Sequence, residues 1–176
     1  MPGRPPLVIG DSVLLGAVDE VTGVGYEVNT RGCRQMSEGL RVIAAKNRAG
    51  RLPSLVVIML GANWKIEPAE IRKALRIVGP GRVLGLVTPR DDPHDSGVIR
   101  AAGRHYPGRV VVLDWAAYTA GHSQWLSPDG LHLGPGGAQA LARLLRTALP
   151  YANPLDGRWE PMSAAAPGDA FSVSAG

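Results

Sequence analysis

Short apolar runs alternate with segments of helical spacing along most of the chain. Apolar, largely β-branched runs predict five strands, at residues 6–10, 25–30, 54–61, 82–88 and 109–115. Apolar residues at helical spacing predict helices at 13–21, 37–50, 67–79, 95–106 and 134–149. Strands that alternate with helices indicate a parallel sheet covered on both faces. We therefore expect an α/β fold, a three-layer α/β/α sandwich with the flavodoxin-like strand order 2-1-3-4-5.

Residues that favour helix ends and chain breaks mark the limits of these elements. Ser37 and Asp95 are the expected N-caps of the second and fourth helices. Pro150 ends the last helix, and the sequence beyond it becomes small, polar and rich in Gly and Pro. We therefore predict one domain over residues 1–150 and a C-terminal extension over 151–176 that is mobile from about residue 161.

Composition narrows the class of protein. Hydrophobic residues make up 45% of the 176 positions and charged residues 19%, which is typical of a globular domain. The net charge of +4 comes from scattered arginines, without a basic run interleaved with aromatics, so we expect no nucleic-acid partner. A single cysteine excludes an internal disulfide.

The expected cellular location rests on two features that the sequence does not show, a membrane span and a signal peptide. No apolar stretch is long enough to span a bilayer, and the N-terminus has no signal-peptide core, so we expect no membrane segment in this chain and a cytoplasmic location. A domain excised from a larger exported membrane acyltransferase would look the same, and an extracytoplasmic location is therefore the alternative.

Four polar features follow predicted strands, where an open parallel sheet binds its ligands. They are Ser12 after the first strand, "RGCRQ" at 31–35, "GANW" at 61–64 and "DGLHL" at 129–133. Taken singly, each has an ordinary interpretation as a helix cap, a turn or a histidine near the core. Taken together, they supply a hydroxyl, an imidazole, a carboxylate and oxyanion donors, which are the parts that acyl transfer requires.

The segments "GDSVLLG", a glycine near position 32, "GAN" at 61–63 and "DGLH" at 129–132 resemble the four blocks of SGNH (GDSL-type) hydrolases. The first and last of these motifs are most similar to those in the SGNH domains of bacterial O-acyltransferases, including those that act on peptidoglycan. The resemblance implies that Ser12 is the nucleophile, His132 its base and Asp129 the group that orients the imidazole. It also implies an oxyanion hole made of the backbone N–H of Ser12, a backbone N–H at Gly32 or Cys33, and the side-chain amide of Asn63.

Two other candidates are weaker. Cys33 could itself be a nucleophile, but no second histidine motif is placed to serve it. The segment "RDDPHDS" at 90–96 gathers three aspartates and His94, which could bind a metal, but a loop that ends in a helix cap is the favoured interpretation. We expect neither a metal nor a cofactor.

The predicted function is that of a serine esterase or O-acyltransferase that works through an acyl-serine. The expected partners are a small ester or acyl donor and a polar alcohol acceptor such as a glycan. The acyl group is expected to be short, with acetyl the first candidate. The alternative is a non-catalytic ligand-binding domain on the same fold. The oligomeric state is not determined by the sequence.

Geometry separates these alternatives. If Ser12 is a nucleophile, Nε2 of His132 should lie within hydrogen-bond reach of its Oγ, and Asp129 should meet the other ring nitrogen. Asn63 should point its amide into the same space. Asp11 should stay outside this chain of hydrogen bonds and hold the turn through backbone N–H groups.

Overall fold

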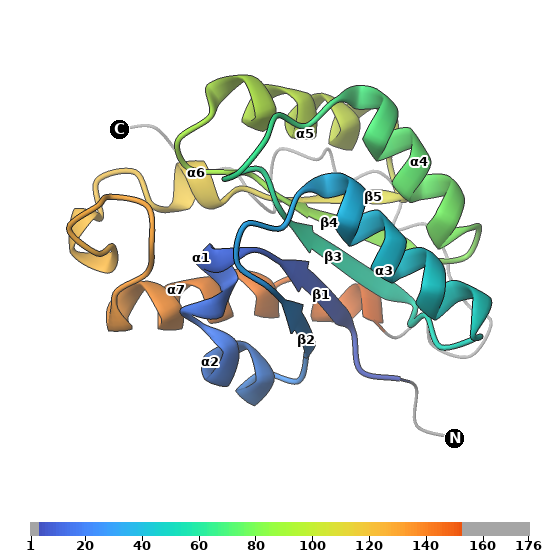
Figure 1. Cartoon of the computed structure of the whole chain (residues 1–176), viewed down its shortest axis with the longest axis horizontal. Helices are drawn as coiled ribbons and strands as arrows, with labels where there is room; N and C mark the ends of the chain where they lie inside the picture. The colour runs from blue at the N-terminus through green and yellow to red at the C-terminus, as the bar shows by residue number, and fades with distance from the viewer. Residues whose placement is uncertain (1–3, 153–176) are drawn as a thin grey trace.

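A computed structural model describes residues 4–152. Within them, five parallel strands form one sheet in the order β2-β1-β3-β4-β5 (Figure 1). The strands are β1 (Leu7–Gly10), β2 (Glu27–Thr30), β3 (Leu55–Met59), β4 (Val83–Val87) and β5 (Val110–Leu113). This order confirms the predicted fold class.

Helices cover both faces of the sheet, as Figure 1 shows. One face is covered by α3 (Met36–Arg48), α4 (Pro68–Val78) and α5 (Pro93–His105). The other is covered by α1 (Ser12–Leu15), α2 (Val18–Gly23) and α7 (Pro135–Arg146). The remaining short elements are α6 (Trp115–Tyr118) and the 3₁₀ helices η1 (Ser123–Trp125) and η2 (Leu149–Ala152).

The position of β3 at the centre of the sheet explains why its sequence is apolar without alternation. Leu55, Val57 and Met59 pack on the face of α7, and Val56 and Ile58 pack on the face of α3 and α4. A parallel strand between two helical layers has no side facing water, so every position is apolar.

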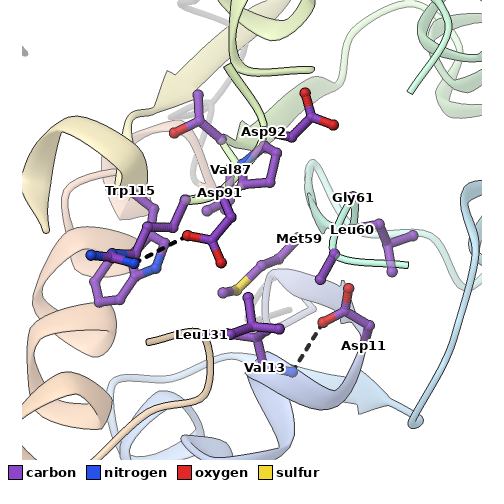
Figure 2. Close-up of a pocket in the computed structure, with 14 residues that line it drawn as sticks. Asp11, Val13, Met59, Leu60, Gly61, Val87, Asp91, Asp92, Trp115 and Leu131 are labelled. Atoms are coloured by element: carbon purple, nitrogen blue, oxygen red, sulfur yellow. Dashed lines mark hydrogen bonds and ion pairs between the residues drawn. The ribbon is translucent and has the colours of Figure 1, made fainter. Parts of the chain in front are cut away.

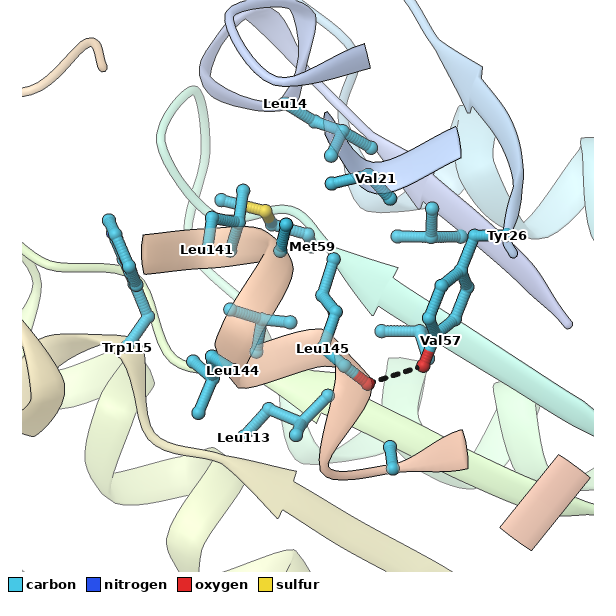
Figure 3. Packing of buried hydrophobic residues seen from close by; sticks show 14 of the residues in the cluster. Leu14, Val21, Tyr26, Val57, Met59, Leu113, Trp115, Leu141, Leu144 and Leu145 are labelled. Carbon is cyan, nitrogen blue, oxygen red and sulfur yellow. Dashed lines mark hydrogen bonds between the residues drawn. The ribbon is translucent and has the colours of Figure 1, made fainter. Parts of the chain in front are cut away.

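The side chains of α7 interlock with the sheet and with the segment after α2 (Figure 3). Leu141 and Leu145 are fully buried there. The hydroxyl of Tyr26, which precedes β2, donates to the carbonyl oxygen of Leu145 over 2.8 Å. Its phenol is thereby buried with its polar atom satisfied, and the first and last thirds of the chain are joined.

Two predicted caps are wrong, and in each case the helix begins earlier. α3 is capped by Gln35, whose exchange of hydrogen bonds with Glu38 forms a capping box, and not by Ser37. α5 is capped by Asp92, because Pro93 suits the first helical position. Asp95 lies inside that helix, fully buried, and accepts from the backbone N–H of Ile66 over 2.8 Å.

The segment predicted as one helix at 13–21 is two short ones. Gly16 ends α1, and the chain turns at Ala17 before α2 begins. The predicted extension at 151–176, mobile from about residue 161, lies outside the described residues from residue 153 onward. Between residues 4 and 152, no helix combines the length and the apolar character that crossing a membrane requires.

The winding of the chain reverses at β1. From β1 the chain proceeds to β2 on one side, and from β2 it returns across the sheet to β3 on the other side. The connections at the carboxyl ends of β1 and β3 therefore diverge onto opposite faces and leave a crevice between them, which is where open α/β sheets bind ligands.

Gly137 lets α7 lie against the loop that precedes it. A Cβ at this position would lie 1.9 Å from the carbonyl oxygen of Trp125, a backbone atom that cannot swing aside. Trp125 belongs to the loop that ends in the "DGLH" motif. The small residue thus fixes where that motif sits above the sheet.

We predict that Gly137→Ala destabilises the protein by about 1–3 kcal/mol, the usual cost of overpacking. Gly97→Ala is the matched control, because Gly97 lies in α5 with open space around its Cα, and alanine there should add about 0.5–1 kcal/mol. Thermal unfolding of both variants measures the difference. Equal melting temperatures would contradict the packing argument.

Candidate active site

Ser12 is the first residue of α1, directly above the carboxyl end of β1. The strand-to-helix turn is tight. A Cβ on Gly10 would lie 2.4 Å from a methyl carbon of Leu14, so only glycine lets α1 fold back onto the strand. The hydroxyl of Thr30 donates to the carbonyl oxygen of Asp11 over 2.6 Å and ties the turn to β2. Ser12 is half-buried at the crevice of the sheet.

A chain of hydrogen bonds joins Ser12, His132 and Asp129. Nε2 of His132 lies 3.0 Å from Oγ of Ser12, although 120 positions separate the two residues. Nδ1 of His132 lies 2.7 Å from Oδ2 of Asp129. Both expected contacts are present. With the aspartate on Nδ1–H, the imidazole presents Nε2 to the hydroxyl as an acceptor, which is the arrangement that activates a serine.

Asp129 also builds the turn that carries the histidine. Its Oδ1 accepts from the backbone N–H groups of Leu131 and His132, each over 2.9 Å. The side-chain hydrogen bond from His132 is the main cause that lowers the pKa of Asp129 to about 2. The two backbone bonds lower this pKa further. Asp129 is therefore ionised throughout the neutral range, beside the ring that would become positively charged.

The loop over residues 122–133 is held by contacts within itself and by a contact from the segment after β4. Its two ends meet in the antiparallel bridge between Leu126 and Leu133. The rings of His122 and Trp125 stack with their centroids 4.0 Å apart. Nη1 of Arg90, which follows β4, donates to the carbonyl oxygen of Gly130 over 2.6 Å.

The contact of Arg90 with this loop is not predicted by the sequence, where "RDDPHDS" indicates only a metal site or a loop that ends in a helix cap. The Nε of Arg90 is buried and has no hydrogen-bond partner among residues 4–152. The signal was its position just beyond the carboxyl end of a strand, where side chains reach the same rim as Ser12.

Asp11 stands beside this chain of hydrogen bonds and does not join it. Its Oδ1 accepts from the N–H of Val13 over 3.0 Å, and its Oδ2 accepts from Nδ2 of Asn63 over 3.3 Å. Burial raises the pKa of Asp11, against the lowering effect of these bonds and of one from the backbone of Ala62. Asp11 thus holds the turn, as expected, and links the ends of β1 and β3.

The hydrogen bond to Asp11 holds the side chain of Asn63 at the rim of the sheet. A primary amide has two N–H donors, and the bond to Asp11 occupies one of them. The other is the donor that an oxyanion would need.

Gly32 and Cys33 form the turn after β2, the strand that neighbours β1. The buried guanidinium of Arg34 fixes this turn, since its Nη1 donates to the carbonyl oxygens of Asn29 and Gly10. Cys33 has a φ of +56°, which is uncommon for a residue other than glycine, and its side chain is exposed. Which of the two residues supplies an N–H to the site stays a prediction.

A pocket of about 190 Å³ opens beside the turn after β1, at the ends of β3 and β4 (Figure 2). Asp11 and Val13, the neighbours of Ser12, line one side, and Leu131, the neighbour of His132, lines another. Met59 and Trp115 contribute apolar surface. The remaining lining residues come from the ends of β3 and β4; they are Leu60, Gly61, Ala62, Val87, Thr88, Pro89, Arg90, Asp91 and Asp92.

The three potential metal ligands at the start of α5 do come together. Ligand atoms of Asp92, His94 and Asp95 lie within 4.8 Å of one another. Asp92 caps the helix by accepting from the N–H of Asp95 over 2.9 Å, and Asp95 holds both the N–H of Ile66 and Nδ1 of His94. These bonds account for the cluster as a helix start, which is the interpretation that the sequence favoured.

Comparison with known proteins finds relatives among bacterial O-acetyltransferases. The chain is 26% identical over 149 residues to the peptidoglycan O-acetyltransferase OatA of Listeria monocytogenes serovar 1/2a. That alignment covers 81% of this chain and 24% of that protein. The chain therefore spans about a quarter of the length of the curated relatives it matches. No protein-family model matches the chain.

Solved structures show the same fold. The C-terminal catalytic domain of OatA from Streptococcus pneumoniae, with a methylsulfonyl adduct, superposes with a TM-score of 0.73 at 22% identity, over 85% of this chain and 94% of that one. The lipase/acylhydrolase from Enterococcus faecalis gives a TM-score of 0.61 at 19% identity, over 86% of this chain and 99% of that one.

The resemblance to SGNH hydrolases that the four motifs predict is confirmed by these relatives and by the fold. They also support the prediction that the chain is an enzyme of this type, a carboxylic ester hydrolase or O-acetyltransferase.

We predict a specific pH dependence from Asp129. Its folded pKa, about 2, lies below the ordinary value of 3.8, so its stabilising contribution is present above about pH 4 and is lost as the pH falls toward 2. Asp129→Asn removes this contribution. The melting temperature of the variant should lie below that of the wild type at neutral pH, and the gap should narrow between about pH 4 and pH 2. A gap that is constant over this range would contradict the assignment.

Proposed function

We propose that the chain transfers short acyl groups through an acyl-serine formed on Ser12. The observation that carries the proposal is the pair of contacts on His132, 3.0 Å to Oγ of Ser12 and 2.7 Å to Oδ2 of Asp129. A serine hydroxyl is a weak nucleophile until a positioned base takes its proton, and this arrangement supplies both the base and the group that orients it.

In the first half of the reaction, Oγ of Ser12 attacks the carbonyl carbon of an ester while Nε2 of His132 takes the hydroxyl proton. The carbonyl π electrons move to oxygen and form an oxyanion. When the tetrahedral intermediate collapses, the carbonyl re-forms and the bond to the leaving oxygen breaks. The imidazolium gives its proton to that oxygen, which departs as the alcohol. The ionised Asp129 stabilises the imidazolium between these steps.

In the second half, a second hydroxyl compound attacks the acyl-serine. His132 takes the proton of the attacking group and then gives it to Oγ of Ser12, which leaves as the free hydroxyl. Water as the attacking group gives an esterase, and a sugar hydroxyl gives an O-acyltransferase. The residues at the site serve both outcomes, because only the attacking group differs.

The oxyanion hole of this proposal consists of the backbone N–H of Ser12, an N–H from the Gly32–Cys33 turn, and Nδ2 of Asn63. The bond from Asn63 to Asp11 supports the proposal, because it fixes the amide plane before substrate arrives. A preorganised donor stabilises the charge without having to reorient during the reaction.

The proposed substrate is an acetyl or similarly short ester of a carbohydrate. The pocket that Asp11 and Val13, the neighbours of Ser12, help to line holds about 190 Å³, a volume that suits a short acyl group better than a long chain. A glycan acceptor is supported by the relatives named as peptidoglycan O-acetyltransferases. A glycan of the cell wall would favour the extracytoplasmic location over the cytoplasmic one, and both locations stay predictions.

The alternative, a non-catalytic binding domain on the same fold, would not require these hydrogen bonds. Its binding surface would be served equally well by side chains that do not contact one another. The aligned hydroxyl, imidazole and carboxylate therefore favour the enzyme.

We predict that Ser12→Ala lowers kcat for p-nitrophenyl acetate by at least about a thousandfold, because the nucleophile is lost. The fold should persist, since the half-buried hydroxyl contributes little packing. A fluorophosphonate probe should label the wild type on Ser12 and should not label the variant. Ser123→Ala, an exposed serine in the loop before His132, is the control and should be labelled as the wild type is. Retained activity in Ser12→Ala would refute the mechanism.

We predict that Asn63→Ala lowers kcat by about 10²–10³-fold with a small change in KM, because an oxyanion donor acts mainly in the transition state. Asn47→Ala is the control. Asn47 lies near the C-terminal end of α3, away from the rim, and its amide donates to the carbonyl oxygen of Ile77. Its replacement should leave kcat unchanged. Steady-state kinetics on p-nitrophenyl acetate measure both. A rise in KM with unchanged kcat would instead assign Asn63 to ground-state binding.

A further inference from the structure

Trp64 stands out on the surface of the described residues, with 70% of it exposed. Of the other tryptophans between residues 4 and 152, Trp125 is half-buried and Trp115 is only 2% exposed. A single exposed apolar side chain is ordinary on a protein surface and is not by itself a sign of binding. What sets Trp64 apart is its place in the fold. It lies next to Asn63, at the rim that carries Ser12.

The ring borders a second hollow that shares part of its lining with the first pocket. This hollow holds about 480 Å³ and is lined by Trp64, Lys65, Glu67, Gly61, Ala62 and Asp92. Gly61, Ala62 and Asp92 also line the first pocket. The two hollows therefore adjoin, and together they extend from Asp11 and Val13, which flank Ser12, to the indole of Trp64.

The chemistry of the second hollow matches a sugar ring. A pyranose has a face of C–H groups and a rim of hydroxyls, and its C–H face packs on the electron-rich face of an aromatic ring. Trp64 offers that ring, while Lys65, Glu67 and Asp92 offer a donor and two acceptors for the hydroxyls around it. An acyl chain would require apolar walls on several sides, and these charged neighbours would not provide them.

We propose that Trp64 is the platform on which a hexopyranose ring of the glycan substrate stacks, and that the hollow it borders positions a sugar hydroxyl toward the acyl-serine. The inference rests on the proposed acyl transfer at Ser12. It assigns the carbohydrate to one part of the surface, whereas the acyl group occupies the smaller pocket between the ends of β3 and β4.

The test is the binding of chitopentaose to protein that carries Ser12→Ala, so that no turnover occurs, measured by isothermal titration calorimetry. Adding Trp64→Ala should raise the Kd by roughly tenfold, as expected when an aromatic contact is lost. Adding Trp64→Phe should retain most of the affinity, because an aromatic face remains. Adding His105→Ala removes an exposed ring from the end of α5, remote from the rim, and should leave the Kd unchanged.

Two further measurements on protein that retains Ser12, fluorophosphonate labelling and ester hydrolysis, distinguish failure of this inference from failure of the proposed function. If the wild type is labelled by fluorophosphonate but chitopentaose binds Trp64→Ala and the parent equally, the sugar platform is refuted and acyl transfer stands. If labelling fails but binding still depends on Trp64, acyl transfer is refuted and the sugar site stands. If Trp64→Ala lowers only the hydrolysis of p-nitrophenyl octanoate, the ring contacts an acyl chain and the inference is overturned.

Discussion

The reversal of winding at β1 is the constraint on which the arrangement of the rim depends. Because β2 and β3 lie on opposite sides of β1, the chain leaves β1 and β3 toward different helical layers. Ser12 at the end of β1 and Asn63 beyond β3 therefore stand on the two sides of one crevice. Asp11, a buried carboxylate, connects these sides by accepting a hydrogen bond from Asn63.

The histidine comes to this crevice by a different route. It lies on a loop rather than on a strand end, and its position is set by contacts made elsewhere. Gly137 allows α7 to press against the backbone of Trp125, and Arg90 holds the carbonyl of Gly130 from the end of β4. Loop residues that bear function are commonly held in this way by a rigid scaffold.

The two hollows divide the rim between them. The smaller lies between the ends of β3 and β4, beside Asp11 and Leu131, and is partly apolar. The larger is bordered by Trp64 and charged side chains. An ester of a short acid with a sugar has the same two parts, one apolar and one rich in hydroxyls, and the reacting carbonyl lies where they meet.

The sequence by itself determined the fold and the candidate chemistry. Apolar runs such as 54–61 are long enough and β-branched enough to be strands, and their alternation with helices leaves few topologies. The motifs "GDSV" and "DGLH" pointed to Ser12, Asp129 and His132 as candidates, through their resemblance to the motifs of SGNH hydrolases. Only the tertiary structure decided the rest. Caps depend on which backbone N–H groups are left unpaired, so Asp92 and Gln35 prevailed over Asp95 and Ser37. The contact between Ser12 and His132, the role of Arg90 and the exposure of Trp64 each depend on residues distant in the chain, and local periodicity carries no information about such distances.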